Sequence, residues 1–507
     1  MIALIVALPL VFAFLLSLVS IIWNSKWLSK TFLLIGVLSP WIIFLASLEG
    51  MPFSVILGNW SRISGIEITL NRYNFYFILG ELLVFSLTSI YSLNYFERED
   101  LNKIFLLFLL MHAGFLGTFL SRDLFNFFIY IELASVSVFA LICVSRGKGA
   151  KEAAFRYVVF FFLASIFLLF SIGIIYLETG YLNLELIRKN LVMSREIKIG
   201  LGIAFTSLIL KGGIFPLFFW LPDAHAKADT PISALLSGLM VKTSAYGMVL
   251  LILYFPITHL ETPLMIVAFS SMIFGVLLAV LQQNVKKLLA YSTVSQMGYI
   301  LLGISTLNAF GAIYHVLAHS LFKSGLFLSV GALIQAQKSK NLNKLTYRNS
   351  PTLIVAIVFL SLAIGGISPF IGAVSKKELV SALSGNWVYL FYAVGVGTLI
   401  PFTKLNYHLA KPQKAPKPKR LESIVSLAMA MLTLILGLYF LQNLSFTDPL
   451  LIGLAILIFF ALHHLDIFDF KIPNPIEKRA KDIGEENNFY TIIFVVFMIL
   501  ILLQVYF

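Results

Sequence analysis

Long apolar runs alternate with short polar connections along the whole chain. Most of the runs contain about 20 residues, the length at which an α-helix crosses a hydrocarbon core of roughly 30 Å. We therefore expect an all-α polytopic membrane protein with 14 to 16 transmembrane helices. The predicted spans are residues 2–22, 31–49, 73–95, 102–121, 124–145, 153–177, 198–220, 231–254, 263–282, 289–305, 309–336, 351–382, 386–409, 421–441, 449–465 and 489–507.

The overall composition agrees with this pattern. Of the 507 residues, 59% are hydrophobic and 12% are charged, whereas a soluble domain carries about 25% charged residues. No polar stretch is long enough for a separate soluble domain, and we read the polar segment 466–487 as a solvated loop or a short helix along the membrane. Residues 2–22 lack a preceding basic residue and a cleavage pattern, so we expect a retained helix.

Basic residues are distributed unequally between the two sets of connections. The odd-numbered connections contain 22 Lys and Arg residues and the even-numbered ones contain 6, and residues 411–420 are the most basic odd connection. The positive-inside rule places the odd connections in the cytoplasm and both termini on the outer face of a cell membrane. The net charge of +13 therefore indicates contact with the lipid bilayer, and we expect no nucleic-acid partner.

Two spans contain helix-breaking sequences near their centres or ends. Residues 211–216 read Lys-Gly-Gly-Ile-Phe-Pro, and residues 365–369 read Gly-Gly-Ile-Ser-Pro. They lie five spans apart, in the seventh and twelfth spans, which predicts two inverted five-helix repeats with broken helices. The alternative is that Gly and Pro are simply frequent in membrane helices. The predicted organisation is residues 1–101 as N-terminal transmembrane helices, 102–254 and 255–410 as the two repeats, and 411–507 as C-terminal helices.

Several charges lie inside the predicted spans of the first repeat, where each costs roughly 2.5–3.5 kcal/mol unless it has a partner or water. Glu132, Lys211 and Lys242 come from three different spans, and Lys211 adjoins the Gly-Gly sequence. A Glu–Lys–Lys series can pass a proton if its pairings are rearranged, although a structural ion pair is an alternative. Glu81, in the third span, has no assigned role.

The second repeat has its own polar residues. His315, His319 and Lys323 follow i, i+4, i+8 spacing and form one stripe on the eleventh span. Histidine can relay protons near neutral pH, and a metal site would need further ligands. Lys376 follows the second break, and Lys377 is a weaker candidate because it can reach the interface.

The connection after the seventh span contains His225, Asp223 and Asp229. We interpret residues 221–231 as a loop. These three side chains have two alternative roles. One is proton entry or gating, and the other is to maintain the architecture of the loop.

Three long motifs carry a resemblance to a known family. Residues 219–247, beginning Phe-Trp-Leu-Pro-Asp-Ala-His, residues 286–298 and residues 315–328 resemble the signatures of antiporter-like membrane subunits. That family includes the M-type subunit of complex I, the D-type subunit of Mrp cation/proton antiporters and relatives in membrane-bound hydrogenases. The resemblance extends over residues of about 70 to 410.

The resemblance implies broken seventh and twelfth helices and a role for each candidate residue. Glu132 and Lys211 would form the key ion pair and Lys242 a connecting lysine, whereas His315, His319 and Lys323 would lie in a central axis. Lys376 would be the terminal charge of the second repeat. M-type subunits carry Glu at this last position, whereas Lys376, Lys377 and Glu378 are adjacent here.

We therefore predict an ion-translocating subunit that moves protons, or exchanges protons for sodium, within a multisubunit respiratory complex or an Mrp-type antiporter. We expect no cofactor in this chain: nothing resembles a dinucleotide fingerprint, and the single Cys143 cannot hold an iron–sulfur cluster. Energy would arrive from other membrane subunits, including further antiporter-like subunits. The alternatives are a self-sufficient cation/proton antiporter and a structural scaffold whose charges only fix helix packing.

Overall fold

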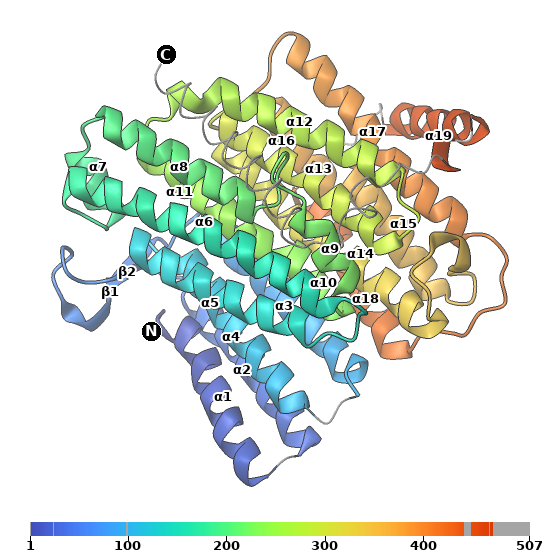
Figure 1. Ribbon diagram of the computed structural model, residues 1–507, viewed down its shortest axis with the longest axis horizontal. Helices are drawn as coiled ribbons and strands as arrows, with labels where there is room; N and C mark the ends of the chain where they lie inside the picture. Colours follow the sequence, from blue (N-terminus) through green and yellow to red (C-terminus); the bar gives the residue numbers. More distant parts are fainter. Residues whose placement is uncertain (1, 24, 98–99, 441–447, 466, 470–507) are drawn as a thin grey trace. The chain divides into compact units, whose positions relative to one another are not determined.

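The computed structural model describes residues 2–23, 25–97, 100–440, 448–465 and 467–469, and its regular structure is almost entirely helical (Figure 1). Residue contacts divide the chain into two compact units. Unit 1 comprises Met1–Gly212 and Lys227–Leu260, and unit 2 comprises Gly213–Ala226 and the described residues from Glu261 onward.

Unit 1 consists of long helices and one β-hairpin. Helices α4, α5, α6 and α8 pack side by side in this order (Figure 1). The hairpin pairs β1 with β2 in antiparallel register. The bounds are α1 Leu4–Ile22, α2 Lys26–Ala46, β1 Phe53–Ile56, η1 Leu57–Asn59, β2 Glu67–Leu70, α3 Phe75–Tyr95, α4 Leu101–Leu120, α5 Leu124–Cys143, α6 Ala150–Thr179, α7 Leu184–Asn190, α8 Arg195–Lys211, α10 Thr230–Leu235, η2 Leu236–Met240, α11 Val241–Tyr254 and η3 Thr258–Leu260.

Unit 2 is helical throughout its described residues. Helices α12 and α13 pack tightly together, and α14 contacts α13, α15, α16 and α18. The bounds are α12 Glu261–Val280, α13 Val285–Ser305, α14 Ala309–Gln337, η4 Leu342–Lys344, α15 Pro351–Gly365, α16 Ile371–Val380, α17 Asn386–Leu409, α18 Arg420–Phe440, α19 Asp448–His464 and η5 Ile467–Asp469. Helix α9, Trp220–Lys227, begins in this unit.

The helices have the length and composition of membrane spans. Among the described residues, 12 helices are long and apolar enough to cross a membrane, and α15 and α19 are shorter apolar helices. The described residues are therefore mostly helical, with the many candidate spans of a polytopic membrane protein. The predicted span 489–507 lies outside the described residues, as does all of segment 466–487 except residues 467–469.

Both predicted breaks interrupt a helix. Helix α8 ends at Lys211 and is followed by Gly213 with φ +62°, whereas α15 ends at Gly365 and is followed by Gly366 with φ +81°. These left-handed conformations suit glycine, which has no Cβ to clash. After each break the chain forms a second, short helix, α9 or α16.

One interpretation from the sequence was wrong. Residues 221–227 were expected to be a loop, but they belong to α9. Pro222 lies in the first turn of this helix, where a missing N–H costs little. The neighbouring polar residues had suggested a solvated loop, whereas most of α9 is buried.

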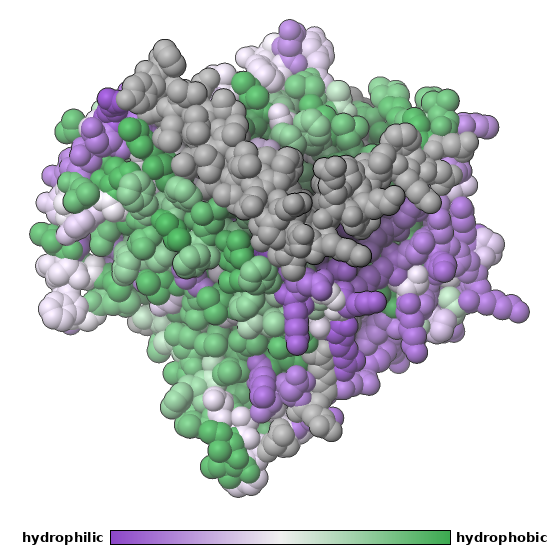
Figure 2. Space-filling model, viewed as in Figure 1, coloured by the Kyte–Doolittle hydropathy of each residue, from purple (hydrophilic) through white to green (hydrophobic). Residues whose placement is uncertain are grey.

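Within each unit, contacts join connections of the same kind, either two even-numbered connections or two odd-numbered ones. In unit 1, the even connections pair through Ile68 with Ser121 and Asp123 with Asn183. In unit 2, the Asn349 side chain of one odd connection donates to the Ala415 carbonyl of another, at 2.7 Å. Figure 2 shows hydrophilic residues gathered where these two unit 2 connections lie in Figure 1. These contacts bring even-numbered connections together in unit 1 and odd-numbered connections together in unit 2.

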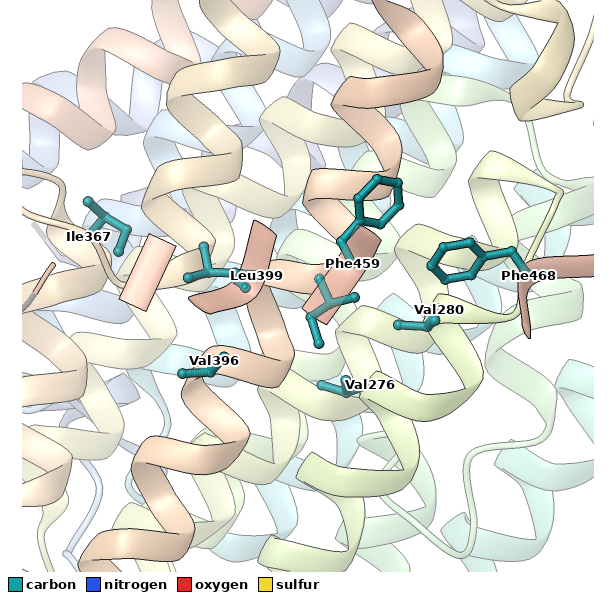
Figure 3. Close-up of a cluster of buried hydrophobic side chains, with 9 residues drawn as sticks. Val276, Val280, Ile367, Val396, Leu399, Phe459 and Phe468 are labelled. Carbon is teal, nitrogen blue, oxygen red and sulfur yellow. The ribbon is translucent and has the colours of Figure 1, made fainter. Parts of the chain in front are cut away.

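Helix α19 packs on unit 2 through apolar side chains. Phe459 of α19 joins a buried cluster with Val276 and Val280 of α12 and Val396 and Leu399 of α17 (Figure 3).

The first residue of α19 is attached separately to the second helix break. The Asp448 carboxylate accepts a hydrogen bond from the backbone N–H of Ser368, at 2.7 Å. Helix α19 is therefore linked to the α15–α16 break as well as to α12 and α17.

Gly275 determines how closely α12 approaches α13. A Cβ at this position would collide with the backbone of Ser295, whereas a Cβ at Gly173 of α6 would meet nothing within 4 Å. We expect Gly275→Val to destabilise the protein by about 1–3 kcal/mol, the usual cost of overpacking. The measurement is the midpoint of thermal unfolding in detergent, with Gly173→Val as control. Equal midpoints for the two variants would contradict this packing.

Candidate functional site

Glu132 and Lys211 form the predicted ion pair in unit 1. Lys211 Nζ lies 2.9 Å from Glu132 Oε1. Ser165 of α6 lies between the two side chains: its hydroxyl accepts from Lys211 Nζ at 2.9 Å, and its single proton can be donated to Glu132 Oε1 or to the Phe161 carbonyl, both at 2.7 Å. Three helices, α5, α6 and α8, thus hold one polar triad.

The surroundings of this triad are apolar on the lysine side. Lys211 is fully buried, and its Nζ lies 4.8 Å from the centre of the Phe161 ring. Glu132 is 28% exposed in the isolated chain. The carboxylate is therefore the more accessible member, and the lysine depends on Glu132, Ser165 and the aromatic ring for stabilisation of its charge.

Lys242 lies immediately after a π-helical turn, a feature that the sequence pattern did not reveal. Residues Leu236–Met240 form the π-helix η2 between α10 and α11. Lys242 is 1% exposed, and its Nζ donates to the Ser237 carbonyl at 2.9 Å. Because a π turn widens the helix to i, i+5 spacing, it aligns residue 242 with the carbonyl of residue 237. π turns are frequent at functional sites.

Lys376 is the buried member of the Lys376–Lys377–Glu378 run in unit 2. Its Nζ donates to the Gly365 carbonyl at 3.0 Å and lies 4.7 Å from the centre of the Tyr299 ring. Lys377 is exposed. The α15–α16 break thus supplies the oxygen that contacts the buried ammonium, and Lys376 is the better candidate of the two lysines.

His315, His319 and Lys323 form the expected buried stripe on α14. His315 Nδ1 lies 3.0 Å from Ser375 Oγ, and the two histidine rings are stacked with centroids 6.3 Å apart. Lys323 Nζ donates to the Leu289 carbonyl at 2.8 Å and to the Ser292 hydroxyl.

Tyr299 brings this stripe close to Lys376. Its ring centroid lies 5.4 Å from that of His315, and the same ring contacts Lys376 Nζ. Ser375, the partner of His315, directly precedes Lys376 in the chain. In unit 2 the Tyr299 ring therefore lies beside both Lys376 and His315, and His319 and Lys323 follow His315 on the same face of α14.

The three candidates of segment 221–231 do not form one cluster. His225 is buried in α9 and stacks on Phe327 with centroids 4.5 Å apart. Asp223 lies 3.7 Å from Lys287, and Asp229 is the N-cap residue of α10. The Asp229 side chain makes no capping hydrogen bond to α10.

The partners Ser165, Tyr299 and Ser375 were missed from the sequence. Serine and tyrosine are common in membrane helices, and their spacing alone gave no signal. Within the described part of the chain, no group of three or more His, Cys, Asp or Glu residues could hold a metal ion.

Comparisons with known proteins support one family. Residues 121–401 match the family described as NADH:quinone oxidoreductase/Mrp antiporter, TM. The chain is 32% identical over 367 residues to the N subunit of the NADH-quinone oxidoreductase of Desulforudis audaxviator, with 68% of this chain and 72% of the relative covered. It is also 32% identical over 370 residues to the D subunit of the Na(+)/H(+) antiporter of Alkalihalophilus pseudofirmus, with 69% and 74% covered.

A solved structure has a similar fold over most of the chain. A chain of the membrane-bound sulfane sulfur reductase, an archaeal respiratory membrane complex, superposes with a TM-score of 0.80 and 26% sequence identity. The match covers 92% of this chain and 97% of that chain.

The contact between Lys376 and the α15–α16 break can be tested with two glycines of positive φ. A Cβ at Gly366 would collide with the Lys376 side chain, whereas one at Gly180, which has the same left-handed conformation, would meet nothing within 4 Å. Gly180→Ala should cost about 1–2 kcal/mol for backbone strain alone. Gly366→Ala should cost about 1.5–3 kcal/mol more, because Lys376 must leave the Gly365 carbonyl. Equal midpoints of thermal unfolding would show that this contact contributes nothing to stability.

Proposed function

Because the chain belongs to the family of NADH:quinone oxidoreductase/Mrp antiporter membrane subunits, we infer that it is an ion-translocating membrane subunit of a multisubunit complex. The matched residues 121–401 include every candidate charge, from Glu132 to Lys376.

We propose that protons, or protons in exchange for sodium, move along a row formed by Glu132, Lys211, Lys242, His315, His319, Lys323 and Lys376. The observation that carries this proposal is the Glu132–Ser165–Lys211 triad. At an effective dielectric constant of about 20, charges at this separation attract each other by roughly 5 kcal/mol. Protonation of Glu132 would remove that attraction and leave the Lys211 ammonium to seek another partner. One proton would thus change the electrostatics of its neighbour.

The polar region of unit 2 supports the second half of the row. His315 and His319 can accept and donate protons through two ring nitrogens, and Lys376 and Lys323 lie at either end of this stripe. The Ser375 and Ser292 hydroxyls can act as both donors and acceptors. A proton that moves along this region would alter the charge next to each lysine in turn, so the titrations would be coupled.

We propose the corresponding architecture for the whole chain. It would have 14 to 16 transmembrane helices, with inverted repeats over residues 102–254 and 255–410. The support is that each range contains one helix interrupted at a glycine of positive φ, in α8 and α15. The basic connections would lie in the cytoplasm and both termini on the outer face of a cell membrane.

The partners would be other membrane subunits, including further antiporter-like subunits, and these would deliver the driving energy. A self-sufficient antiporter is the alternative. Reconstitution of the purified chain in liposomes separates the two, because ion exchange without any partner subunit would favour the alternative.

Replacement of the carboxylate tests the triad. Glu132→Gln should reduce coupled ion movement by about 10²-fold or more, the usual effect of removing a proton-transfer group, while the complex still assembles. The measurement is the rate of ion movement in membrane vesicles. Glu196→Gln, which alters an exposed carboxylate in the first turn of α8, is the control. Normal transport by Glu132→Gln would remove this residue from the mechanism.

Cysteine labelling tests the orientation. After replacement of the single Cys143 by Ser, one cysteine is introduced either at Ser61, between β1 and β2, or at Lys414, in the most basic connection. Both positions are exposed. A membrane-impermeant maleimide added to sealed cells should label Ser61→Cys and leave Lys414→Cys unlabelled until the cells are opened. The reverse pattern would invert the topology.

A further inference from the structure

Unit 1 contains a second buried pair of titratable side chains, Glu81 of α3 and His112 of α4. His112 Nδ1 lies 2.6 Å from Glu81 Oε1, and both side chains are fully buried. Phe85 stacks on the imidazole ring with centroids 4.4 Å apart. The pair precedes the family match at residues 121–401.

Each member of the pair retains an atom that is available for another hydrogen bond. Among the described residues, Glu81 Oε2 and His112 Nε2 have no hydrogen-bond partner. A buried carboxylate oxygen and a buried imidazole nitrogen that lack partners are rare in folded proteins and call for an explanation. A structural pair would be expected to use all of its hydrogen-bonding atoms.

The local charge balance limits this pair to one mobile proton. Neutral imidazole already carries one N–H proton. When one further proton is bound, either by the Glu81 carboxylate or by the His112 ring, the pair has no net charge. Loss of that proton leaves one negative charge in an apolar interior, and gain of a second leaves one positive charge. Both states need compensation from outside the pair.

Thirteen other titratable residues lie on the helices and strands around the pair. Helices α1 and α10 and the π turn η2 carry none, although all three pack against α3 or α4. The other titratable residues lie on α3 and α4 themselves and on their remaining neighbours α2, α5, α11 and β2. They are Lys26, Lys30, Glu67, Tyr76, Tyr91, Tyr95, Lys103, Tyr130, Glu132, Cys143, Lys242, Tyr246 and Tyr254.

The pair lies next to the helix that carries Glu132. Helices α4 and α5 are in close contact, because a Cβ on Gly114 would lie 2.7 Å from the Ala134 backbone nitrogen. His112 and Glu132 are each two residues from this contact, which is about 3 Å along either helix axis, and each lies on the side of its helix that faces away from the contact. A charge change at His112 would therefore act on Glu132 across the two packed helices.

Helix α3 offers polar positions between the pair and the connection at residues 96–100. Thr88 and Ser92 follow Glu81 by 7 and 11 residues, on the same helix face. Both are fully buried, and the Thr88 hydroxyl has no partner among the described residues. Buried hydroxyls of this kind are typical binding sites for internal water.

We propose that Glu81 and His112 form a further proton-binding site, which is loaded along α3 and acts on the Glu132–Lys211 pair. In the loading step a hydronium ion that arrives along α3 gives up one proton: an O–H bond breaks in the hydronium, which becomes water, and an O–H bond forms at Glu81 or an N–H bond at His112. The net charge of the pair changes from −1 to 0. This proposal rests on the function proposed above.

The test uses the assembled complex and two readouts. The first is the infrared difference spectrum between about pH 5 and 8, the range in which imidazole changes its charge. The second is the rate of ion movement in vesicles. Glu81→Gln should abolish the carboxyl or imidazole bands of the pair and reduce the rate by at least about tenfold. Thr118→Val, which removes another fully buried polar group of α4, should leave both readouts unchanged.

A double variant keeps the proposal testable if Glu81→Gln does not assemble. Glu81→Gln combined with His112→Gln retains an amide hydrogen bond between the helices but cannot titrate, so it should assemble and transport slowly. Wild-type spectra or wild-type rates in either assembled variant would overturn the proposal.

Glu132→Gln separates this inference from the proposed function. If that variant transports normally, the proposed function fails, while the spectrum still shows whether the Glu81–His112 pair titrates. If Glu132→Gln is inactive and the bands of the pair remain, both proposals stand.

Discussion

The free-energy cost of a charge inside an apolar helix bundle explains the arrangement of the candidate site. A lysine placed at the centre of a membrane helix is expensive unless oxygen atoms surround its ammonium. Lys211 meets this requirement with a carboxylate and a hydroxyl. Lys323 and Lys376 meet it with carbonyl and hydroxyl oxygens. The buried lysines therefore decide which backbone and serine oxygens must face the interior.

Irregular helices supply many of these oxygens. A regular α-helix uses each carbonyl internally, so a carbonyl without an intrahelical partner is found where the helix ends or changes its spacing, whereas the Leu289 carbonyl inside α13 accepts from Lys323 with its second lone pair. Gly365 offers its carbonyl to Lys376 at the end of α15, and Ser237 offers its carbonyl to Lys242 in the π turn. The same breaks that shorten the helices thus stabilise the charges beside them, so helix geometry and charge placement are linked.

Much of this arrangement could be predicted from the sequence, because lysines and Gly-Gly sequences are rare enough in apolar runs to be informative. The breaks after Lys211 and Gly365, the Glu132–Lys211 pair and the stripe on α14 all follow from such residues. The partners Ser165, Tyr299 and Ser375 could not be predicted, since small polar residues are frequent in membrane helices. The π turn before Lys242 leaves no periodic signature, and helix α9 was hidden by its polar composition.

The attachment of α19 has a consequence for how this protein can diverge during evolution. Asp448 binds the backbone N–H of Ser368 rather than its side chain. Any residue except proline at position 368 can supply that donor. The contact therefore requires an acceptor at residue 448 but places no further demand on the side chain of residue 368. The attachment of α19 to the break can persist when the side chain at position 368 changes.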